Sequence, residues 1–424
     1  MKNIKKYAFS DLYDMSSGIS TKKEQAGHGS PFVSFSTVFN NYFLPDVLPD
    51  LMNTTEKEQN TYSIKEGDIL VTRTSETINE LAMSCVALKD YPTATYSGFT
   101  KRLRPKTEGI VYYKYLAFYL RSYLFRKTVT NNAFITTRAS FNEDIFSFLN
   151  LYLPDYDEQV RIGDLLYSME KKIRLNKRII AELEQMAKTI YDYWFVQFDF
   201  PNVEGKPYHS SGGEMVWNSR LKREIPKDWE DSLISNEFIT LLGGTPDTKV
   251  SKYWNGNIPW LSSGEIATSP IIKSEKSITE SGINNSTTSF VKAGAVLLSI
   301  TRYIRPSILE IDACFNQSVV AIIPTSKFKT AFLYPFMLSQ VNRYMSLRTG
   351  AQQPHINKTV VDETIFVVPD EQTLEKYYDL VEPIYNKITS IAKEIDELTN
   401  FREWLLPMLM NGQVTLNSCL VPSL

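Results

Sequence analysis

Arginine, tyrosine and amide side chains follow predicted apolar strands in two parts of this chain, where they could contact a nucleic acid. Arg73 and Thr74 follow one apolar run, and Arg302 and Tyr303 follow another. Arginine can bind a guanine edge through two hydrogen bonds, and amide side chains bind adenine similarly. A second polar loop in each part aligns when the sequence is compared with itself at a constant offset, with Arg138 and Ser140 in the first part and Gln352, Gln353 and His355 in the second. These residues are candidates for reading bases; the alternative for each by itself is a structural or solvent-facing role.

A basic strand is a further candidate for contact with DNA. Between Thr100 and Lys106, strand alternation puts Arg102, Arg104 and Lys106 on one face, opposite Phe99 and Leu103. Such a row suits contacts to DNA phosphates. An ordinary solvated strand face is an equal alternative.

The patterns of common catalytic and metal sites are missing from the sequence. The stretch from Gly243 to Lys249 lacks the spacing of a phosphate-binding loop, and no nucleophile elbow or cofactor loop occurs. Three cysteines and three histidines are scattered, so no metal-ligand spacing exists. We therefore expect a binding protein with no metal or cofactor of its own.

The net charge and the hydropathy of the chain limit how it could bind DNA and where it could be located. The net charge of −2 means that any DNA contact needs local basic faces or a basic partner. No window approaches the roughly 18 apolar residues of a membrane span, and the first residues lack the apolar core of a signal peptide. We expect a cytoplasmic location.

Two long helices are predicted to position these loops. Pro154-Asp155 returns as Pro369-Asp370, and Asn142 aligns with Asn357 at the same offset along the chain. After each Pro-Asp turn comes a helix whose apolar residues are spaced alternately by four and three, as in a coiled coil. Asn176 interrupts this seam, and a polar residue there can fix helix register. The seam comprises Ile173, Asn176, Ile180 and Leu183 in the first helix and Ile388, Ile391, Ile395 and Leu398 in the second.

The two helices could pair with each other or with a second chain. The exact repeat inside one chain favours pairing within the chain. The first helix ends in a dense aromatic stretch that includes Trp194 and Phe195, which we expect in a core or a partner interface. In the second helix, Pro383 could produce a kink or mark the first turn.

The two variable stretches contain strands, turns and one helix in a similar order, so we expect two α+β domains of one fold. The predicted single helix from Tyr112 to Arg126 corresponds to that from Phe332 to Met345. We divide the chain into a first domain (1–150), a first helical region (151–200), a surface connector (201–228), a second domain (229–366), and a second helical region with a tail (367–424).

Over essentially its whole length, the chain resembles the specificity subunit of type I restriction–modification systems. The resemblance is carried by Trp194 to Pro201 followed by GKPYHSSGGEMVWN and LKREIPKDW, by GGTPDTKVSKYWNGNIPWLSSGEI, and by SGISTKKEQAGHGSPFVSFSTVFNNYFLP. It implies two globular α/β target-recognition domains joined by two long antiparallel helices, with a pseudo-two-fold internal repeat. Each domain would read half of a bipartite DNA target, and the helices would set the unread spacer.

The resemblance also implies partners. The family assembles with two methylation subunits, which bind S-adenosylmethionine and methylate adenine, and optionally with restriction subunits that use ATP and magnesium. No catalysis is implied for this chain. Because the aligned loops differ, the two halves should read different sequences. Two alternatives stay open: a scaffold that organises other proteins without DNA, and a free-standing DNA-modifying enzyme.

Overall fold

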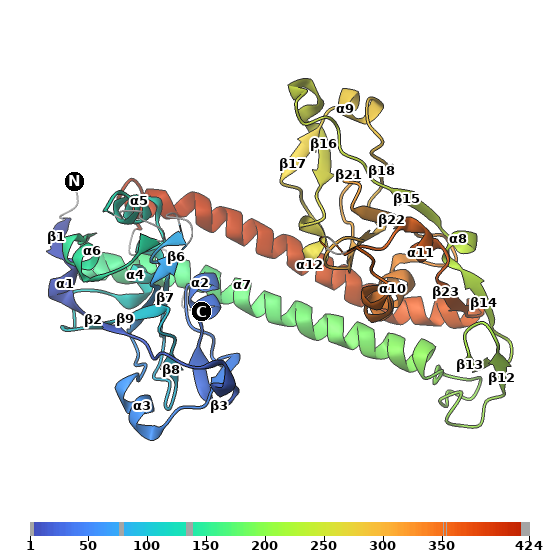
Figure 1. Ribbon diagram of the computed structural model, residues 1–424, viewed down its shortest axis with the longest axis horizontal. Coiled ribbons are helices and arrows are strands. Elements are labelled where there is room, and N and C mark those ends of the chain that lie inside the picture. The colour runs from blue at the N-terminus through green and yellow to red at the C-terminus, as the bar shows by residue number, and fades with distance from the viewer. Residues whose placement is uncertain (1–3, 76–79, 133–138, 351, 353, 417–424) are drawn as a thin grey trace. The chain divides into compact units, whose positions relative to one another are not determined.

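The computed structural model describes residues 4–75, 80–132, 139–350, 352 and 354–416 (Figure 1). The chain forms two compact units. The first contains residues 1–173 and 397–424, and the second contains residues 174–396.

The first unit is built on two small sheets and two strand pairs. An antiparallel sheet has the order β2 (Tyr13–Ser17), β9 (Thr100–Pro105), β5 (Ile69–Thr72) and β7 (Ser84–Val86). The second sheet has the order β4 (Asp50–Met52), β3 (Ala26–Val33) and β8 (Thr95–Tyr96), with β3 and β8 parallel. The pairs are β1 (Lys5–Ala8) with β11 (Asn150–Leu153), and β6 (Thr74–Ser75) with β10 (Ala139–Ser140). The short helices are α1 (Phe9–Leu12), α2 (Phe35–Asn40), α3 (Glu56–Thr61), α4 (Tyr113–Tyr119), α5 (Tyr123–Asn132) and α6 (Glu143–Phe148).

The second unit repeats this plan. Its antiparallel sheet has the order β15 (Ile239–Leu242), β22 (Val319–Ile323), β19 (Val296–Ser299) and β20 (Arg305–Ile308). Its other sheet has the order β17 (Lys276–Ile278), β16 (Trp254–Leu261), β21 (Ala313–Phe315) and β18 (Phe290–Val291), with β16 and β21 parallel. β14 (Glu230–Leu233) pairs with β23 (Ile365–Val368), and β12 (Met215–Asn218) forms a hairpin with β13 (Arg223–Pro226). The short helices are α8 (Ile234–Glu237), α9 (Glu280–Asn284), α10 (Thr330–Ser346) and α11 (Lys358–Asp362).

The agreement between the units extends to irregular backbone. In β3, Ala26 and Ser30 both face Met52, and in β16 Trp254 and Ile258 both face Ile278. Two strands therefore carry the same bulge at the same place. The prediction of two α+β domains of one fold is confirmed.

The sequence repeat reappears as matching helix caps. The side chain of Asn142 accepts a hydrogen bond from the Ile145 amide at the start of α6, and Asn357 caps α11 in the same way. Asp155 and Asp370 accept amide hydrogen bonds of 2.9 Å at the starts of the long helices α7 (Tyr156–Tyr191) and α12 (Glu371–Met410). Side-chain oxygens satisfy amides that lack a partner inside a helix. The constant offset in the sequence therefore reflects a repeat in the structure.

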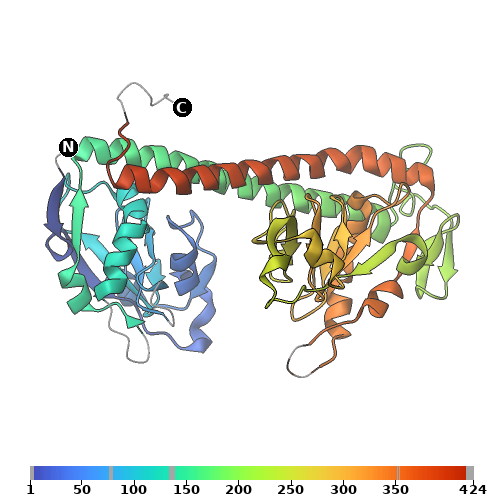
Figure 2. The ribbon, with the colours of Figure 1, turned by 90° about the horizontal axis from the view of Figure 1, so that it is seen from above.

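Both long helices contribute residues to the core of each unit. Figure 2 draws the two helices, α7 in green and α12 in red. In the first unit, Ile162 and Leu166 of α7 and Leu405 and Leu409 of α12 belong to one hydrophobic core. In the second unit the helices run antiparallel, because Asn176 meets Glu394 while the later Tyr191 meets the earlier Tyr377.

Two helix predictions require correction. The segment from Tyr112 to Arg126 is two helices, α4 and α5, and in the break Arg121 turns inward to donate to the carbonyls of Val38, Phe39, Asn41 and Ser84. Pro383 does not mark a first turn, because the cap at Asp370 starts α12 well upstream.

Residues 201–228 are more than a surface connector. They contain the hairpin of β12 and β13, and Ile225 is buried in the core of the second unit. The rings of Phe200 and Trp229 stack at 4.7 Å, which ties the segment to the domain that follows.

Candidate nucleic-acid interface

In the first unit, the end of β5 brings three candidate residues together. The amide of Arg73 donates to the Phe99 carbonyl at 2.8 Å, and the carbonyl of Arg73 accepts from the Phe141 amide at 2.7 Å. Thr74 then pairs with Ser140 in the bridge between β6 and β10. The Arg73 side chain is exposed above this fixed backbone. Arg138 lies outside the described residues.

The second unit has the equivalent junction at the end of β19. Ile300 accepts from the Ile356 amide at 3.0 Å, as Arg73 does from Phe141, and Thr301 pairs with His355. Four candidate residues of this junction are exposed: Arg302, Tyr303, Gln352 and His355. Gln353 lies outside the described residues. The structure therefore assembles polar loops that are far apart in sequence, at the same place in both units.

Two arginines join this junction that the sequence pattern did not single out. Arg348 donates from Nη1 to the Arg302 carbonyl at 2.8 Å, and Arg305 lies 5.2 Å from the centroid of the Tyr303 ring. Within the part of the chain that the structure describes, neither these two arginines nor Arg302 forms an ion pair with a carboxylate. The junction is a local cationic surface on a chain of slightly negative net charge.

The predicted basic face of strand β9 is wrong for Arg102 and Arg104. Arg102 is buried, donates to the Ser63 carbonyl and lies 5.5 Å from the centroid of the Tyr96 ring. Arg104 donates two hydrogen bonds to the buried carboxylate of Asp68, which raises the pKa of the guanidinium. The face of β9 that alternation assigned to solvent is therefore engaged by Ser63, Asp68 and Tyr96.

Lys106 stays exposed beyond the end of β9 but is already paired. Its Nζ lies 3.2 Å from Asp14 and donates to the Ser10 carbonyl at 2.9 Å. An exposed pair of this kind contributes little stability and can be exchanged for a phosphate. The contact of Lys106 with DNA stays a prediction.

The helix seam contains polar contacts as well as apolar ones. Asn176 is 1% exposed and donates to Glu394 at 2.8 Å within the second unit, and Arg402 pairs with Glu170 within the first. Pairs across the seam satisfy groups whose burial alone would be costly. Of the predicted seam residues, Ile173, Asn176, Ile388 and Ile391 are buried, and Ile180, Leu183, Ile395 and Leu398 are half-buried.

Two locations were predicted for Trp194 and Phe195, a core or a partner interface, and the structure places them in a core. Both are buried, and the ring of Phe195 lies 4.8 Å from that of Tyr377 in α12. They join the two long helices and are not available to a partner.

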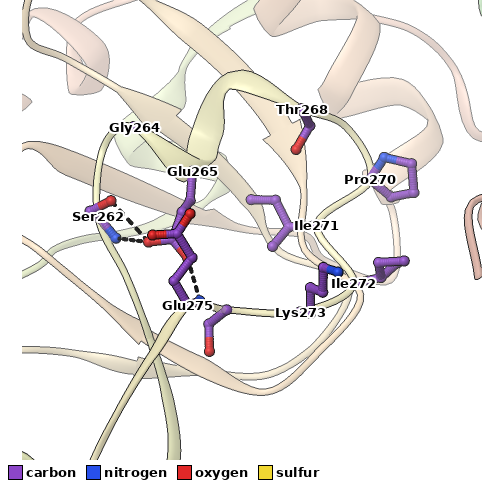
Figure 3. A pocket seen from close by; sticks show the side chains of 10 residues that line it. Ser262, Gly264, Glu265, Thr268, Pro270, Ile271, Ile272, Lys273 and Glu275 are labelled. Atoms are coloured by element: carbon purple, nitrogen blue, oxygen red, sulfur yellow. Dashed lines mark hydrogen bonds between the residues drawn. The ribbon is translucent and has the colours of Figure 1, made fainter. Parts of the chain in front are cut away.

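A hollow of about 790 Å³ in the second unit is lined by the segment that connects β16 to β17 (Figure 3). Glu265 is the acid at its centre, and its two oxygens accept hydrogen bonds from the Ser262 amide and hydroxyl and from the Glu275 amide. Lys273 at the rim pairs with Asp396. These bonds hold the loop together, so the hollow presents few unengaged charges to a ligand.

Within the described residues, no cluster of His, Cys, Asp and Glu could hold a metal ion. No helix among them combines the length and apolar character needed to cross a membrane.

Comparisons with known proteins agree with this geometry. A family model described as "Type I restriction modification DNA specificity domain" matches residues 1–185 and 226–400. The chain is 24% identical over 379 residues to the type I restriction enzyme MjaIX specificity subunit of Methanocaldococcus jannaschii, which covers 85% of this chain and 82% of that protein. It is 22% identical over 325 residues to the HindI specificity subunit of Haemophilus influenzae, covering 64% of this chain and 70% of that one.

The fold is also that of a solved relative. The crystal structure of a type I restriction–modification S subunit from M. genitalium superposes with a TM-score of 0.59 and 15% identity, over 96% of each chain. Two domains of one fold, each with a polar junction at the same strand end, define a two-domain DNA-recognition protein. The chain belongs to the type I restriction–modification DNA specificity family, and the predictions of family and fold class are confirmed. Its role is to specify the DNA sequence and not to catalyse.

Proposed function

We propose that each unit reads one half of a bipartite DNA target through the junction described above, Arg73 with Thr74 and Ser140 in the first and Arg302 with Tyr303 and His355 in the second. The observation that supports this most directly is the repeated pairing of Thr74 with Ser140 and of Thr301 with His355. A repeated scaffold with different side chains suits two readers of different sequences.

We further propose that α7 and α12 set the unread spacer and dock two methylation subunits. With 36 and 40 residues, the helices are about 54 and 60 Å long at about 1.5 Å per residue. That length exceeds one turn of DNA, about 34 Å. The methylation subunits bind S-adenosylmethionine and transfer its methyl group, and restriction subunits, where present, use ATP and magnesium. On this proposal the complex works on DNA in the cytoplasm.

An exposed aromatic pair on α12 supports docking of a protein partner. Phe401 and Trp404 stack at 5.9 Å and are 48% and 63% exposed. Exposed aromatic rings on a helix are typical centres of protein interfaces. Trp404→Ala should weaken assembly with the methylation subunit at least about ten-fold, measured by titration calorimetry. Trp217→Ala is the control, since Trp217 is 67% exposed on the hairpin.

The experiment that tests the main proposal is a map of adenine methylation. The chain is expressed with the methylation subunit encoded beside it in a host free of such methylation. A bipartite motif that disappears when the chain is omitted supports the proposal. A stable complex without methylation contradicts it and favours a scaffold that does not bind DNA.

A further inference from the structure

The backbone at Arg302 adopts a rare turn. Arg302 has a φ of 58°, and the Tyr303 amide donates to the Thr301 carbonyl at 2.6 Å. A hydrogen bond from residue i+2 to residue i around a positive φ is the γ-turn that proteins seldom adopt because it is strained. Such strain persists where surrounding structure enforces it, and it concentrates at functional sites.

Contacts on both sides enforce this turn. The Arg302 amide donates to the Pro354 carbonyl at 2.8 Å, and the Arg302 carbonyl accepts from Arg348 at 2.8 Å. The amide and the carbonyl of the strained residue are therefore both engaged. The turn is therefore rigid and fixes the position of the residue that follows Arg302.

That residue is Tyr303, an exposed aromatic ring between cations. The ring is 56% exposed, and the guanidinium carbons of Arg302 and Arg305 lie 5.7 and 5.2 Å from its centroid. Arginines beside an aromatic ring restrict its motion and present donors for phosphates. The following Ile304 is buried and fixes the base of the loop.

We propose that Tyr303 is an aromatic wedge that stacks into one base step of the half-site read by the second unit, while Arg302 and Arg305 hold the flanking phosphates. Proteins insert side chains between base pairs to unstack and kink DNA, and the cost depends on the sequence being deformed. Tyr303 then selects a deformable step without hydrogen-bonding to a base. This inference rests on the proposed function.

The first unit has no equivalent wedge in its sequence. Thr74 and Thr301 occupy the same place, since their bridge partners Ser140 and His355 are repeat-related. The residues that follow Thr74 are Ser75 and Glu76, where the second unit has Arg302 and Tyr303. Neither residue type can stack on a base, and a carboxylate repels phosphate. We therefore infer that a wedge at this position acts in only one half of the target.

The experiment uses the full complex with the methylation subunits and a duplex that carries the target. A fluorescent base analogue that brightens when unstacked replaces each base of both half-sites in turn. We compare wild type with Tyr303→Phe, which keeps the ring, Tyr303→Ala, which removes it, and Trp217→Ala, an exposed aromatic on the hairpin.

With wild type and Tyr303→Phe, fluorescence should rise several-fold at one step of the second unit's half-site other than the methylated adenine. With Tyr303→Ala this rise should disappear and affinity should fall about ten-fold or more, while Trp217→Ala behaves as wild type. Unchanged fluorescence and affinity in Tyr303→Ala overturn the wedge alone, because both half-sites are still recognised. A wild-type complex that recognises neither half-site overturns the proposed function and the wedge with it.

Discussion

Asp68 is fully buried, and its charge is balanced by Arg104. Two guanidinium nitrogens of Arg104 lie 2.8 and 2.6 Å from the two carboxylate oxygens, and the Lys65 amide donates to the same group at 2.7 Å. Removing one partner of a buried pair leaves an uncompensated charge. The pair therefore stabilises the first unit and does not contact DNA.

Arg104→Met should lower the free energy of unfolding by about 3 kcal/mol, measured by urea denaturation. The DNA half-site read by the first unit should stay the same at temperatures where the variant is folded. A variant of wild-type stability that reads a different half-site would contradict this assignment and restore the predicted basic strand face.

Arg73 differs from Arg104 because hydrogen bonds fix its backbone while its side chain is exposed. If it binds a base edge, Arg73→Ala should reduce discrimination in one half-site by about 1–3 kcal/mol. Competition binding against single-base variants of the target measures this. Lys206→Ala is the control, since Lys206 is an exposed cation paired with Glu204 outside the junction. An equal loss of affinity for every sequence would instead make Arg73 a phosphate contact.

The cap at the start of α12 couples helix formation to pH. Burial alone would raise the pKa of the Asp370 carboxyl, but hydrogen bonds from Thr373 and from the Trp229 indole outweigh it and lower the pKa. A carboxyl whose folded pKa is below its unfolded value stabilises fully above the unfolded pKa, about 3.9. That contribution is lost as pH falls through the folded pKa.

Asp370→Ala should therefore cost about 1–2 kcal/mol at pH 7, and the difference from wild type should shrink below about pH 4. Urea unfolding at a series of pH values measures both effects. Asp155→Ala, measured at pH 7 alone, is the matched variant for loss of the cap hydrogen bond at the start of α7. A difference that stays constant down to about pH 3 would show that the carboxylate charge is not involved.

The pair of Glu170 and Arg402 is asymmetric with respect to the repeat. At the offset that aligns Asn142 with Asn357, Glu170 corresponds to Tyr385 and Arg402 to Ala187, which pack together in an apolar cluster. The polar pair thus makes α7 a better partner for α12 than for another copy of itself. Arg402 also lies 4.8 Å from the centroid of the Tyr42 ring, which anchors it in the first unit.

Arg402→Met should destabilise the chain by about 2–3 kcal/mol, and Glu170→Leu by less, because Arg402 keeps its ion pair with Glu403. The double variant should lose less than the sum of the two losses, because the interaction between Glu170 and Arg402 is then removed only once. Chemical denaturation of the four proteins measures the coupling. Additive losses would mean that the two side chains do not interact in solution.

Local rules predicted much of this architecture from the sequence. The helix that follows each Pro-Asp turn and the apolar seam depend on neighbours within a few residues, and the structure has both helices at the predicted positions. Arg102 and Arg104 could not be placed, because their burial depends on Ser63 and Asp68, which are distant in the sequence. Likewise, only the three-dimensional pairing of Thr301 with His355 explains how Arg348, distant in the sequence, reaches the Arg302 carbonyl.

For the molecule as a whole, the repeated fold implies that its two recognition functions separate. Replacing residues 1–150 by the corresponding domain of a relative should change one half of the methylated motif and leave the other half and the spacer as they are. Genome-wide methylation mapping of the chimera with its methylation subunit checks this. A change in both halves would show that neither unit reads its half independently.

The C-terminal part of α12 completes the hydrophobic core of the first unit, since Leu405, Leu406 and Leu409 pack there with residues from the start of the chain. During synthesis, the first unit therefore cannot complete its core until Leu405, Leu406 and Leu409, which follow the whole second unit in the chain, have been made. A premature stop shortly after Asp396 should unfold the N-terminal half of the protein, far from the lesion in sequence, while the second unit retains its own core. Nonsense mutations near the end of such a gene are accordingly expected to remove recognition by the first domain rather than by the second.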